Sequence, residues 1–194
     1  MTEIILTPES LKLVKNIGLT VSTFHEKHRA LFDIARTFGE KAITYAEIGC
    51  YAGASACLMM HRKNTRIISI DIGTPVKKEL AEKNIARFNL HKNPYNYIQG
   101  DSTSLKTIKA VREMACEGID ILFIDGSHRF NNVLLDFINY NQMVSRGGYI
   151  VFDDYDDHAF SPEVKPAVDY LCDRFINSFE VLNRVPNEFI IQKK

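Results

Sequence analysis

The sequence predicts an α/β fold built on a mostly parallel β-sheet, which an antiparallel hairpin closes at its C-terminal end. Two observations lead to this prediction. Short apolar runs alternate with longer segments of helical period, which is typical of βαβ units whose strands pair in parallel. Near the C-terminus, two strand-like runs are separated by too few residues for a crossover helix, so they must pair antiparallel. These two runs are Phe179–Arg184 and Glu188–Gln192, with Val185–Asn187 between them.

Five apolar runs before this hairpin are the expected strands of the parallel part. Each is short, rich in β-branched or aromatic residues, and followed by a turn or by the start of a helix. Together with the hairpin strands they predict a sheet of seven strands. They are Ile43–Ile48, Arg66–Asp71, Tyr97–Gly100, Ile119–Asp125 and Tyr149–Asp153.

Segments of helical period between the strands are expected to cover both faces of the sheet. Before the first strand, Thr7–Lys15 and Thr23–Gly39 predict two helices without a strand of their own, so residues 1–40 form a helical extension of the kind that covers a site. No repeat or linker marks a boundary, and residues 1–194 are predicted to form a single domain. The other helices are Ala54–Arg62, Val76–Asn89, Ser104–Cys116, Asn131–Val144 and one from Pro162 to about Ile176.

Composition and charge argue against several classes of protein. The chain is 45% hydrophobic with a formal net charge of +0 and no block of basic residues, so we expect neither a nucleic-acid nor a membrane partner. No signal-peptide profile and no apolar run of about 18 residues is present, which favours a soluble cytoplasmic protein. The cysteines lack disulfide-framework or metal-finger spacing, as expected for reduced thiols. They are Cys50, Cys57, Cys116 and Cys172.

Acidic residues end two of the predicted strands. Asp125 lies in the motif ILFIDGSH (Ile121–His128), and Asp153 and Asp154 lie in GGYIVFDDY (Gly147–Tyr155). The carboxyl ends of neighbouring parallel strands meet at one edge of the sheet, where uncompensated charge is costly unless something binds it. Hard oxygen donors of this kind suit Mg²⁺ or Mn²⁺. Simple turn chemistry at the strand ends is the alternative.

The first strand also ends in an acid. Glu47 is followed by Gly49, Gly53 and a helix start of small residues, where the backbone can approach a ligand closely. The glycine spacing differs from the G-x-G-x-x-G dinucleotide fingerprint, and an acid here would repel a pyrophosphate. These features argue against a nicotinamide-dependent oxidoreductase and favour a ligand with a cationic group.

The ends of the next two strands indicate a nucleoside. Asp71 ends the second strand at the position where an acid accepts hydrogen bonds from a ribose. Asp101 and Ser102 follow the third strand, where they could meet an adenine edge, although such residues also cap helices. A nucleoside that carries an amino acid would satisfy both Glu47 and Asp71.

From about Thr23 onward, these residues resemble the class I S-adenosylmethionine-dependent methyltransferases. The resemblance implies their Rossmann-like fold and S-adenosyl-L-methionine as the cofactor. It also implies that the first loop lines the methionine half of the cofactor, that Asp71 holds the ribose, and that Asp101 and Ser102 meet the adenine. The residues expected to contact the cofactor are Glu47, Gly49, Cys50, Tyr51, Gly53, Ser55, Asp71, Asp101, Ser102 and Asp125.

Within that class, IDGSH and GGYIVFDDY look like the small metal-dependent O-methyltransferases that act on sugar hydroxyls of macrolides and other glycosides. That group also includes cephalosporin-hydroxylase-like proteins. The resemblance implies that Asp125, Asp153 and Asp154 hold Mg²⁺ and that His128 is the general base. The expected function is metal-assisted transfer of a methyl group to a hydroxyl of a sugar, a glycoside or a related small molecule.

Two alternative functions stay open at the level of sequence. A catechol-type O-methyltransferase would need the same metal and a flat aromatic acceptor, which Phe24, Phe32 and Phe130 could clamp. A non-catalytic nucleotide-binding module would keep the fold without turnover. A homodimer is compatible with either. Residues of uncertain role are His25 and His28 in the extension, and Asp156, Asp157 and His158 after the last acids.

Overall fold

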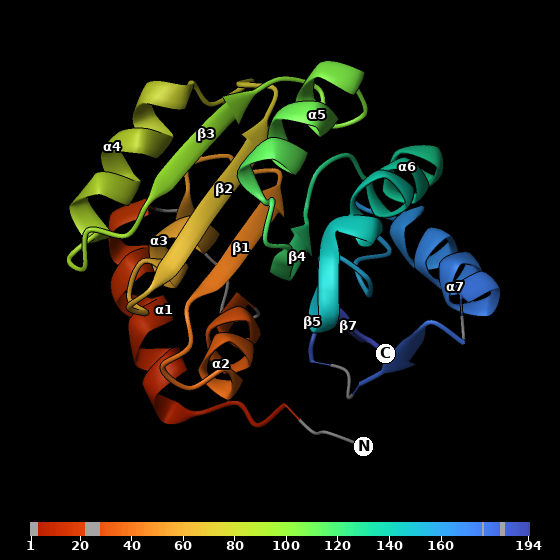
Figure 1. Cartoon of the computed structure of the whole chain (residues 1–194), viewed down its shortest axis with the longest axis horizontal. Coiled ribbons are helices and arrows are strands. Elements are labelled where there is room, and N and C mark those ends of the chain that lie inside the picture. Colours follow the sequence, from red (N-terminus) through yellow and green to blue (C-terminus); the bar gives the residue numbers. More distant parts are fainter. Residues whose placement is uncertain (1–3, 22–27, 176, 183–184) are drawn as a thin grey trace.

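The computed structural model describes residues 4–21, 28–175, 177–182 and 185–194. Its centre is a seven-stranded sheet with the order β3-β2-β1-β4-β5-β7-β6 (Figure 1). The strands β1 to β5 pair in parallel, and β7 is antiparallel to both β5 and β6. The predicted mostly parallel sheet with its C-terminal hairpin is therefore confirmed. The strands are β1 Ile43–Ile48, β2 Thr65–Asp71, β3 Tyr95–Gln99, β4 Ile119–Ile124, β5 Val144–Phe152, β6 Phe179–Val181 and β7 Phe189–Lys193.

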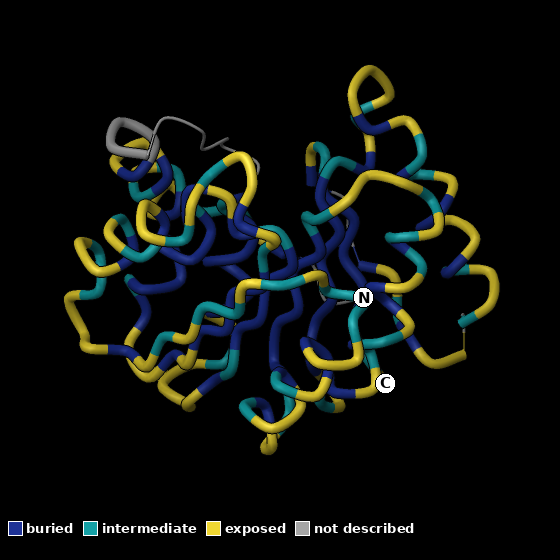
Figure 2. Tube along the Cα trace, turned by 90° about the horizontal axis from the view of Figure 1, so that it is seen from above, coloured by how far each residue is buried: buried dark blue, intermediate teal, exposed yellow. Residues whose placement is uncertain are grey.

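The helices divide between the two faces of the sheet. Buried side chains of α1, α2, α3 and α4 belong to one hydrophobic cluster, and those of α5, α6 and α7 belong to the other. Burial is deepest in the central strands, and exposure concentrates in the peripheral loops (Figure 2). The helices are α1 Pro8–Val21, α2 Arg29–Thr37, α3 Ala54–Met59, α4 Lys78–Phe88, α5 Leu105–Met114, α6 Phe130–Tyr140 and α7 Val164–Phe175.

Side chains alternate between these two clusters along β1. Tyr45 belongs to the cluster under α1 to α4, whereas Ala46 and Ile48 belong to the cluster under α5 to α7. Successive side chains of a strand point to opposite faces, and both faces of a parallel sheet are covered by helices. This explains why the central strands read as continuous apolar runs in the sequence.

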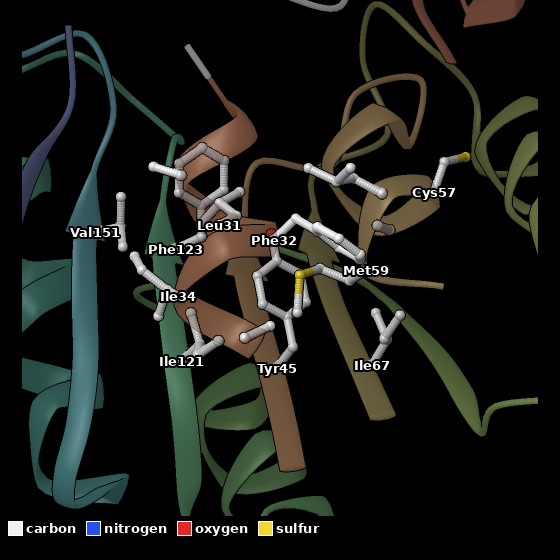
Figure 3. Close-up of a cluster of buried hydrophobic side chains, with 14 of the residues drawn as sticks. Leu31, Phe32, Ile34, Tyr45, Cys57, Met59, Ile67, Ile121, Phe123 and Val151 are labelled. Atoms are coloured by element: carbon white, nitrogen blue, oxygen red, sulfur yellow. The ribbon is translucent and has the colours of Figure 1, made fainter. Parts of the chain in front are cut away.

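The helix α2 is part of the main core. Its residues Leu31 and Ile34 lie near Phe123 and Ile121 of β4 in the close-up of this cluster (Figure 3). Leu31 and Ile34 are both fully buried. Truncating a buried leucine or isoleucine to alanine costs about 2–5 kcal/mol, so α2 contributes strongly to stability. The helical extension is therefore anchored to the sheet.

Polar contacts join α1 to α2. One oxygen of Asp33 accepts hydrogen bonds from the backbone N–H of Thr7 (3.1 Å) and the hydroxyl of Ser10 (2.6 Å). The other oxygen accepts from the hydroxyl of Thr7 (2.8 Å). These bonds satisfy donors at the first turn of α1, where no intrahelical acceptor is available. The start of α1 is thus held by a carboxylate of the next helix.

Several predicted boundaries shift. The helix expected to reach Val144 ends at Tyr140, because residues 141–143 form a 3₁₀ turn and Val144 already pairs with Ile119 as the start of β5. Strand β6 ends at Val181, and residues 183–184 of the predicted strand lie outside the described residues. The same holds for residues 23–27 of the second predicted helix. Among the described helices, none combines the length and hydropathy needed to cross a membrane.

Candidate functional site

A cavity of about 1060 Å³ opens at the carboxyl ends of the parallel strands. Its β1–β3 side is lined from within residues 49–55, 71–74 and 100–102, and its β4–β5 side from within residues 125–128 and 153–161. The sequence predicted ligand-binding residues at these strand ends, and most of them line the cavity. Those that do are Gly49, Cys50, Tyr51, Ser55, Asp71, Asp101, Ser102, Asp125, His128, Asp153 and Asp154.

The strand ends are aligned by backbone hydrogen bonds that continue the sheet ladder. The N–H of Gly49 donates to the carbonyl of Ile70 (2.9 Å), and the N–H of Asp125 donates to the carbonyl of Ile48 (2.8 Å). The N–H of Asp153 then donates to the carbonyl of Ile124 (3.0 Å). Because the ladder runs from β2 to β5 in register, the residue after each strand reaches the same edge.

Gly49 lies where the two sides of the cavity meet. Its φ of +90° is in the left-handed region, and a Cβ at this position would lie 1.8 Å from the carbonyl oxygen of Asp125. Only glycine tolerates both conditions. The absence of a side chain at Gly49 therefore lets the loop after β1 contact the loop after β4.

The carboxylate of Asp71 organises the β1–β3 side. One of its oxygens accepts hydrogen bonds from the backbone N–H groups of Cys50 (2.9 Å) and Tyr51 (2.8 Å), and the other accepts from the N–H of Gly73 (2.6 Å). The same carboxylate lines the cavity. Asp71 therefore ties the loop after β1 to the loop after β2 and presents its remaining acceptor sites to a ligand.

Glu47 does not line the cavity, contrary to the expected cofactor contact. Its side chain is fully buried and accepts hydrogen bonds from the hydroxyls of Tyr45 (2.8 Å), Ser55 (2.6 Å) and Ser69 (2.5 Å). Burial raises the pKa of Glu47, and these three hydroxyls partly offset the effect. Alternation along β1 turns Glu47 to the same face as Tyr45 and away from the open edge of the sheet.

Gly53 does not line the cavity either. It is the N-cap of α3 with a φ of +83°, and a Cβ there would meet the side chain of Ile85 in α4 at 2.9 Å. The sequence pattern indicated close approach to a ligand. The structure shows close approach to a neighbouring helix, which the spacing of glycines alone does not distinguish.

At the end of β3, Ser102 is held from α6. Its hydroxyl donates to Asp136 (2.6 Å), and its carbonyl accepts from the hydroxyl of Tyr140 (2.8 Å). Burial raises the pKa of Asp136 to about 6, although the Ser102 hydrogen bond acts in the opposite direction. The sequence analysis missed Asp136, whose signal is a lone acid on the apolar face of a predicted helix.

Asp101 is exposed and makes a local turn. One oxygen accepts hydrogen bonds from the N–H (2.8 Å) and the hydroxyl (2.7 Å) of Thr103, which lower the pKa of Asp101. The N-cap of α5 is Ser104, whose hydroxyl accepts from the N–H of Thr107. The alternative in which the sequence Asp101–Ser104 caps this helix is therefore confirmed, but the cap is Ser104 and not Asp101 or Ser102.

The β4–β5 side collects carboxylates and imidazoles. Donor atoms of His28, Asp125 and Asp153 lie within 4.8 Å of one another, and so do those of Asp125, His128 and Asp154. Asp125 belongs to both groups. Such oxygen-rich donor sets suit a divalent cation.

His128 is held between two neighbours. Its Nε2 lies 3.1 Å from an oxygen of Asp154, and its Nδ1 lies 2.8 Å from the hydroxyl of Ser161. The Ser161 hydroxyl also lies 3.2 Å from the same Asp154 carboxylate. The imidazole therefore has a defined orientation at the cavity wall. Ser161 carried no sequence signal, because it reaches the site from a loop remote from His128 in the chain.

His28 is buried at the cavity floor and lies 3.4 Å from Asp153, measured from Nε2 to Oδ2. From the sequence, His28 could be either a residue of the acceptor pocket or a solvated residue. His25, which lies on the same face of the predicted helix, is outside the described residues. The structure therefore adds an imidazole from the helical extension to the acids at the ends of β4 and β5.

Residues after the last acids have mixed positions. Asp157 lines the cavity and accepts hydrogen bonds from the N–H groups of Ala159 (3.1 Å) and Phe160 (3.0 Å), whereas Asp156 and His158 are not among the lining residues. The ring of Phe160 is 86% exposed and also lines the cavity.

The predicted aromatic clamp does not form among the described residues. Phe32 is buried in the main core, and Phe130 contacts Tyr170 with a centroid distance of 6.0 Å. Neither lines the cavity, and Phe24 is outside the described residues. Both rings turn toward apolar neighbours, where their burial is favourable.

Residues 46–155 match a protein-family model described as a methyltransferase domain. A curated relative, the uncharacterized protein R132 of Acanthamoeba polyphaga mimivirus, is 41% identical over 148 residues, which are 75% of this chain and 66% of that protein. The chain thus spans just under two thirds of this relative.

Two solved structures share the fold. The methyltransferase MycE from the mycinamycin biosynthetic pathway, in complex with Mg, SAH and mycinamycin VI, matches with a TM-score of 0.68 and 17% identity over 96% of this chain and 55% of MycE. CalS11, a TDP-rhamnose 3'-O-methyltransferase of calicheamicin biosynthesis, matches with a TM-score of 0.67 and 14% identity over 96% of this chain and 87% of CalS11.

Proposed function

This chain belongs to the methyltransferase domain family, and from that premise we propose that it is an S-adenosylmethionine-dependent, metal-assisted O-methyltransferase. The proposed acceptor is a hydroxyl of a sugar, a glycoside or a related small molecule. One observation carries the proposal: Asp71, Asp125, Asp153 and Asp154, from the ends of β2, β4 and β5, line the same cavity as His128. The complex of MycE with Mg, SAH and mycinamycin VI agrees with this kind of cofactor and acceptor, and the name of CalS11 as a TDP-rhamnose 3'-O-methyltransferase agrees with a sugar acceptor.

The β1–β3 side fits S-adenosylmethionine. Cys50 and Tyr51 of the loop after β1 line the cavity, and the carboxylate of Asp71 retains acceptor capacity for ribose hydroxyls. At the end of β3, Asp101 and Ser102 offer polar atoms to an adenine edge. When bound, the cofactor supplies an activated methyl group on its sulfonium.

Glu47 supports this side from below. Its carboxylate holds Ser55 of α3 and Ser69 of β2 by hydrogen bonds, so it joins the helix and the strand that border the loop. We therefore assign Glu47 a positioning role in place of the direct contact expected from the sequence.

The β4–β5 side fits a divalent cation and an oxygen nucleophile. Asp125, Asp153 and Asp154 provide the hard oxygen donors that Mg²⁺ and Mn²⁺ prefer. A cation bound there would supply a positive charge that eases the loss of a proton from a nearby acceptor hydroxyl. The carboxylates also orient the acceptor, because they restrict which of its hydroxyls can enter.

His128 is the proposed general base. His128 lines the cavity, with its Nε2 beside Asp154 and its Nδ1 held by Ser161. In the proposed reaction, Nε2 takes the proton of the acceptor hydroxyl while the oxygen forms a bond to the methyl carbon. The carbon–sulfur bond breaks, and its electron pair stays on sulfur, which becomes a neutral thioether. The charge of the imidazolium is then compensated by Asp154.

A catechol-type acceptor is a second candidate because of Phe160. Its exposed ring lines the cavity and can stack on a flat aromatic acceptor. Methyl-transfer rates with glycosides and with catechols as acceptors, measured on the wild type and on Phe160→Ala, distinguish the two candidate functions. Selective loss of catechol turnover in the variant would favour the second candidate.

The primary test is calorimetric titration with S-adenosylhomocysteine, with and without Mg²⁺, on the wild type and on an Asp153→Ala, Asp154→Ala double variant. We expect S-adenosylhomocysteine to bind both proteins and Mg²⁺ to bind only the wild type. Absence of S-adenosylhomocysteine binding to the folded wild type would contradict the proposed function. Binding of the cofactor product without any metal signal would contradict the metal assistance alone.

A further inference from the structure

The imidazole of His28 has a fixed position beside the acids of the β4–β5 side. The side chain of His28 is 8% exposed, and its ring packs edge-on against Phe123 with a centroid distance of 5.5 Å and an interplanar angle of 71°. Phe123 lies on β4, two residues before Asp125. The strand that immediately precedes Asp125 therefore also contacts the His28 ring.

Distances around His28 are suited to joint coordination of a cation. Its Nε2 is 3.4 Å from Oδ2 of Asp153, which exceeds the usual N–H···O distance of about 2.9 Å. Two neighbouring ligands of a six-coordinate ion lie about 3 Å apart when each bond is about 2.1 Å long. A donor atom of Asp125 lies within 4.8 Å of both. The donor atoms of the three residues are therefore close enough to one another for joint coordination of one ion.

The second imidazole of this side has a different environment. The side chain of His128 is 41% exposed, and its Nδ1 is held by the hydroxyl of Ser161. An exposed imidazole can exchange protons with an acceptor and with water, as a general base must. The buried ring of His28 has no such access and is better suited to act as a fixed donor.

We propose that His28 is a nitrogen ligand of the divalent centre, together with Asp125 and Asp153, and that it makes this centre prefer a first-row transition ion such as Mn²⁺ over Mg²⁺. This inference rests on the proposed function and specifies its metal. Mg²⁺ is bound almost entirely by oxygen donors and retained waters, whereas imidazole favours transition ions.

The position of His28 in the chain connects the proposed metal centre to the helical extension. His28 is the N-cap of α2, and α2 is anchored in the main core by Leu31 and Ile34. It precedes residues 46–155, which match the family model. The helical extension thus completes a centre whose carboxylates come from the family domain.

The test is a parallel titration of Mn²⁺ and Mg²⁺ into the full chain by calorimetry. His28→Phe removes the nitrogen donor and keeps a ring against Phe123, and His28→Ala removes both. His91→Ala is the matched control, because His91 is exposed in the loop that precedes β3 at the opposite end of the strands. We expect about tenfold weaker Mn²⁺ binding in both His28 variants, a smaller change for Mg²⁺, and no change in His91→Ala.

Electron spin echo spectra of bound Mn²⁺ report the ligand directly, since a coordinated imidazole nitrogen modulates the echo. We expect this ¹⁴N modulation in the wild type and in His128→Ala, and its loss in His28→Phe. Modulation that persists in His28→Phe would overturn the assignment. Equal weakening of Mn²⁺ and Mg²⁺ in both His28 variants would overturn it too, because a merely structural histidine would affect both ions alike.

S-adenosylhomocysteine titrated into the same samples separates this inference from the proposed function. Binding of S-adenosylhomocysteine without Mn²⁺ binding to the wild type overturns the metal ligand and leaves methyl transfer standing. Binding of Mn²⁺ with ¹⁴N modulation, but without S-adenosylhomocysteine binding, supports the ligand and contradicts the proposed function.

Discussion

The two sides of the cavity achieve their shape by different means. On the β1–β3 side, the carboxylate of Asp71 accepts three backbone hydrogen bonds from its own loops. On the β4–β5 side, Asp125, Asp153 and Asp154 lie close to one another and to two imidazoles. Like charges held close together in a partly buried site repel one another, and a bound cation compensates this repulsion. The first side is therefore organised by the chain itself, and the second is expected to depend more on a ligand.

The largest effect is expected at the junction of the two sides. Gly49→Ala should lower the free energy of unfolding by more than about 3 kcal/mol, because the new Cβ would clash with the Asp125 backbone at a left-handed residue. Gly147→Ala is the matched control: Gly147 also has a positive φ, but nothing lies within 4 Å of its Cβ position, so about 1 kcal/mol is expected. Urea unfolding measures both. Equal losses would show that the two sides do not meet as tightly as inferred.

The next effect concerns only the β1–β3 side of the cavity. Asp71→Ala should weaken S-adenosylhomocysteine binding about 100-fold, or about 2.7 kcal/mol, because three backbone N–H groups lose their acceptor along with the proposed ribose contact. Asp101→Ala should cost about fivefold, since Asp101 is exposed and solvent screens its contacts. Calorimetry on folded variants measures the difference, and comparable losses would contradict it.

A pH dependence is expected where α6 supports the β1–β3 side. Burial raises the pKa of Asp136 to about 6 in the folded state, above that of an unfolded aspartate, so ionisation destabilises the fold. The folded state binds more protons than the unfolded state between about pH 4 and 6, and stability therefore falls as pH rises through this window. Relative to Asp136→Asn, the wild type should lose on the order of 2 kcal/mol between pH 4 and 7. Parallel pH profiles of unfolding free energy would refute this.

The smallest effect tests the dependence of the β4–β5 side on a ligand. At a Mn²⁺ concentration of about ten times its dissociation constant, the wild type should gain about 1.4 kcal/mol of stability. Asp153→Asn should gain little, because it lacks one of the carboxylate ligands. Glu113→Gln, at an acid that is 68% exposed, is the control and should respond as the wild type does. If Mn²⁺ stabilised Asp153→Asn as much as the wild type, the β4–β5 side would not depend on a bound cation more than the β1–β3 side does.

The acids at the ends of β4 and β5 were predictable because parallel strands in register bring their carboxyl ends to one edge. Asp125 and Asp153 continue the ladder through their N–H groups, so the strand boundaries alone imply that they approach each other. Glu47 shows the limit of this reasoning. It lies one residue before the end of β1, level with Phe123 and not with Asp125, and alternation directs its side chain to Ser55 and Ser69 beneath the cavity. The identity of a strand-end residue does not reveal which face its side chain takes.

The residues that the sequence analysis missed approach the site from elsewhere. Ser161 reaches His128 from the loop before α7, and Asp136 reaches Ser102 from α6. His28, which the sequence analysis named without deciding its role, reaches Asp153 from the extension. None of these pairs is close in the chain, and none follows from the period of a helix or strand. Their proximity depends on how the helices pack on the sheet.

The sequence by itself determined the alternation of strands and helices, the closing hairpin and the edge of the sheet where acids gather. These features follow from local periodicity, from connection lengths and from the geometry of parallel strands. Only the tertiary structure decided that Glu47 lies beneath the cavity, that Gly53 faces a helix, and that His28 lies beside Asp153. Burial and contact partners are non-local properties, because they depend on which segments pack together when the chain folds.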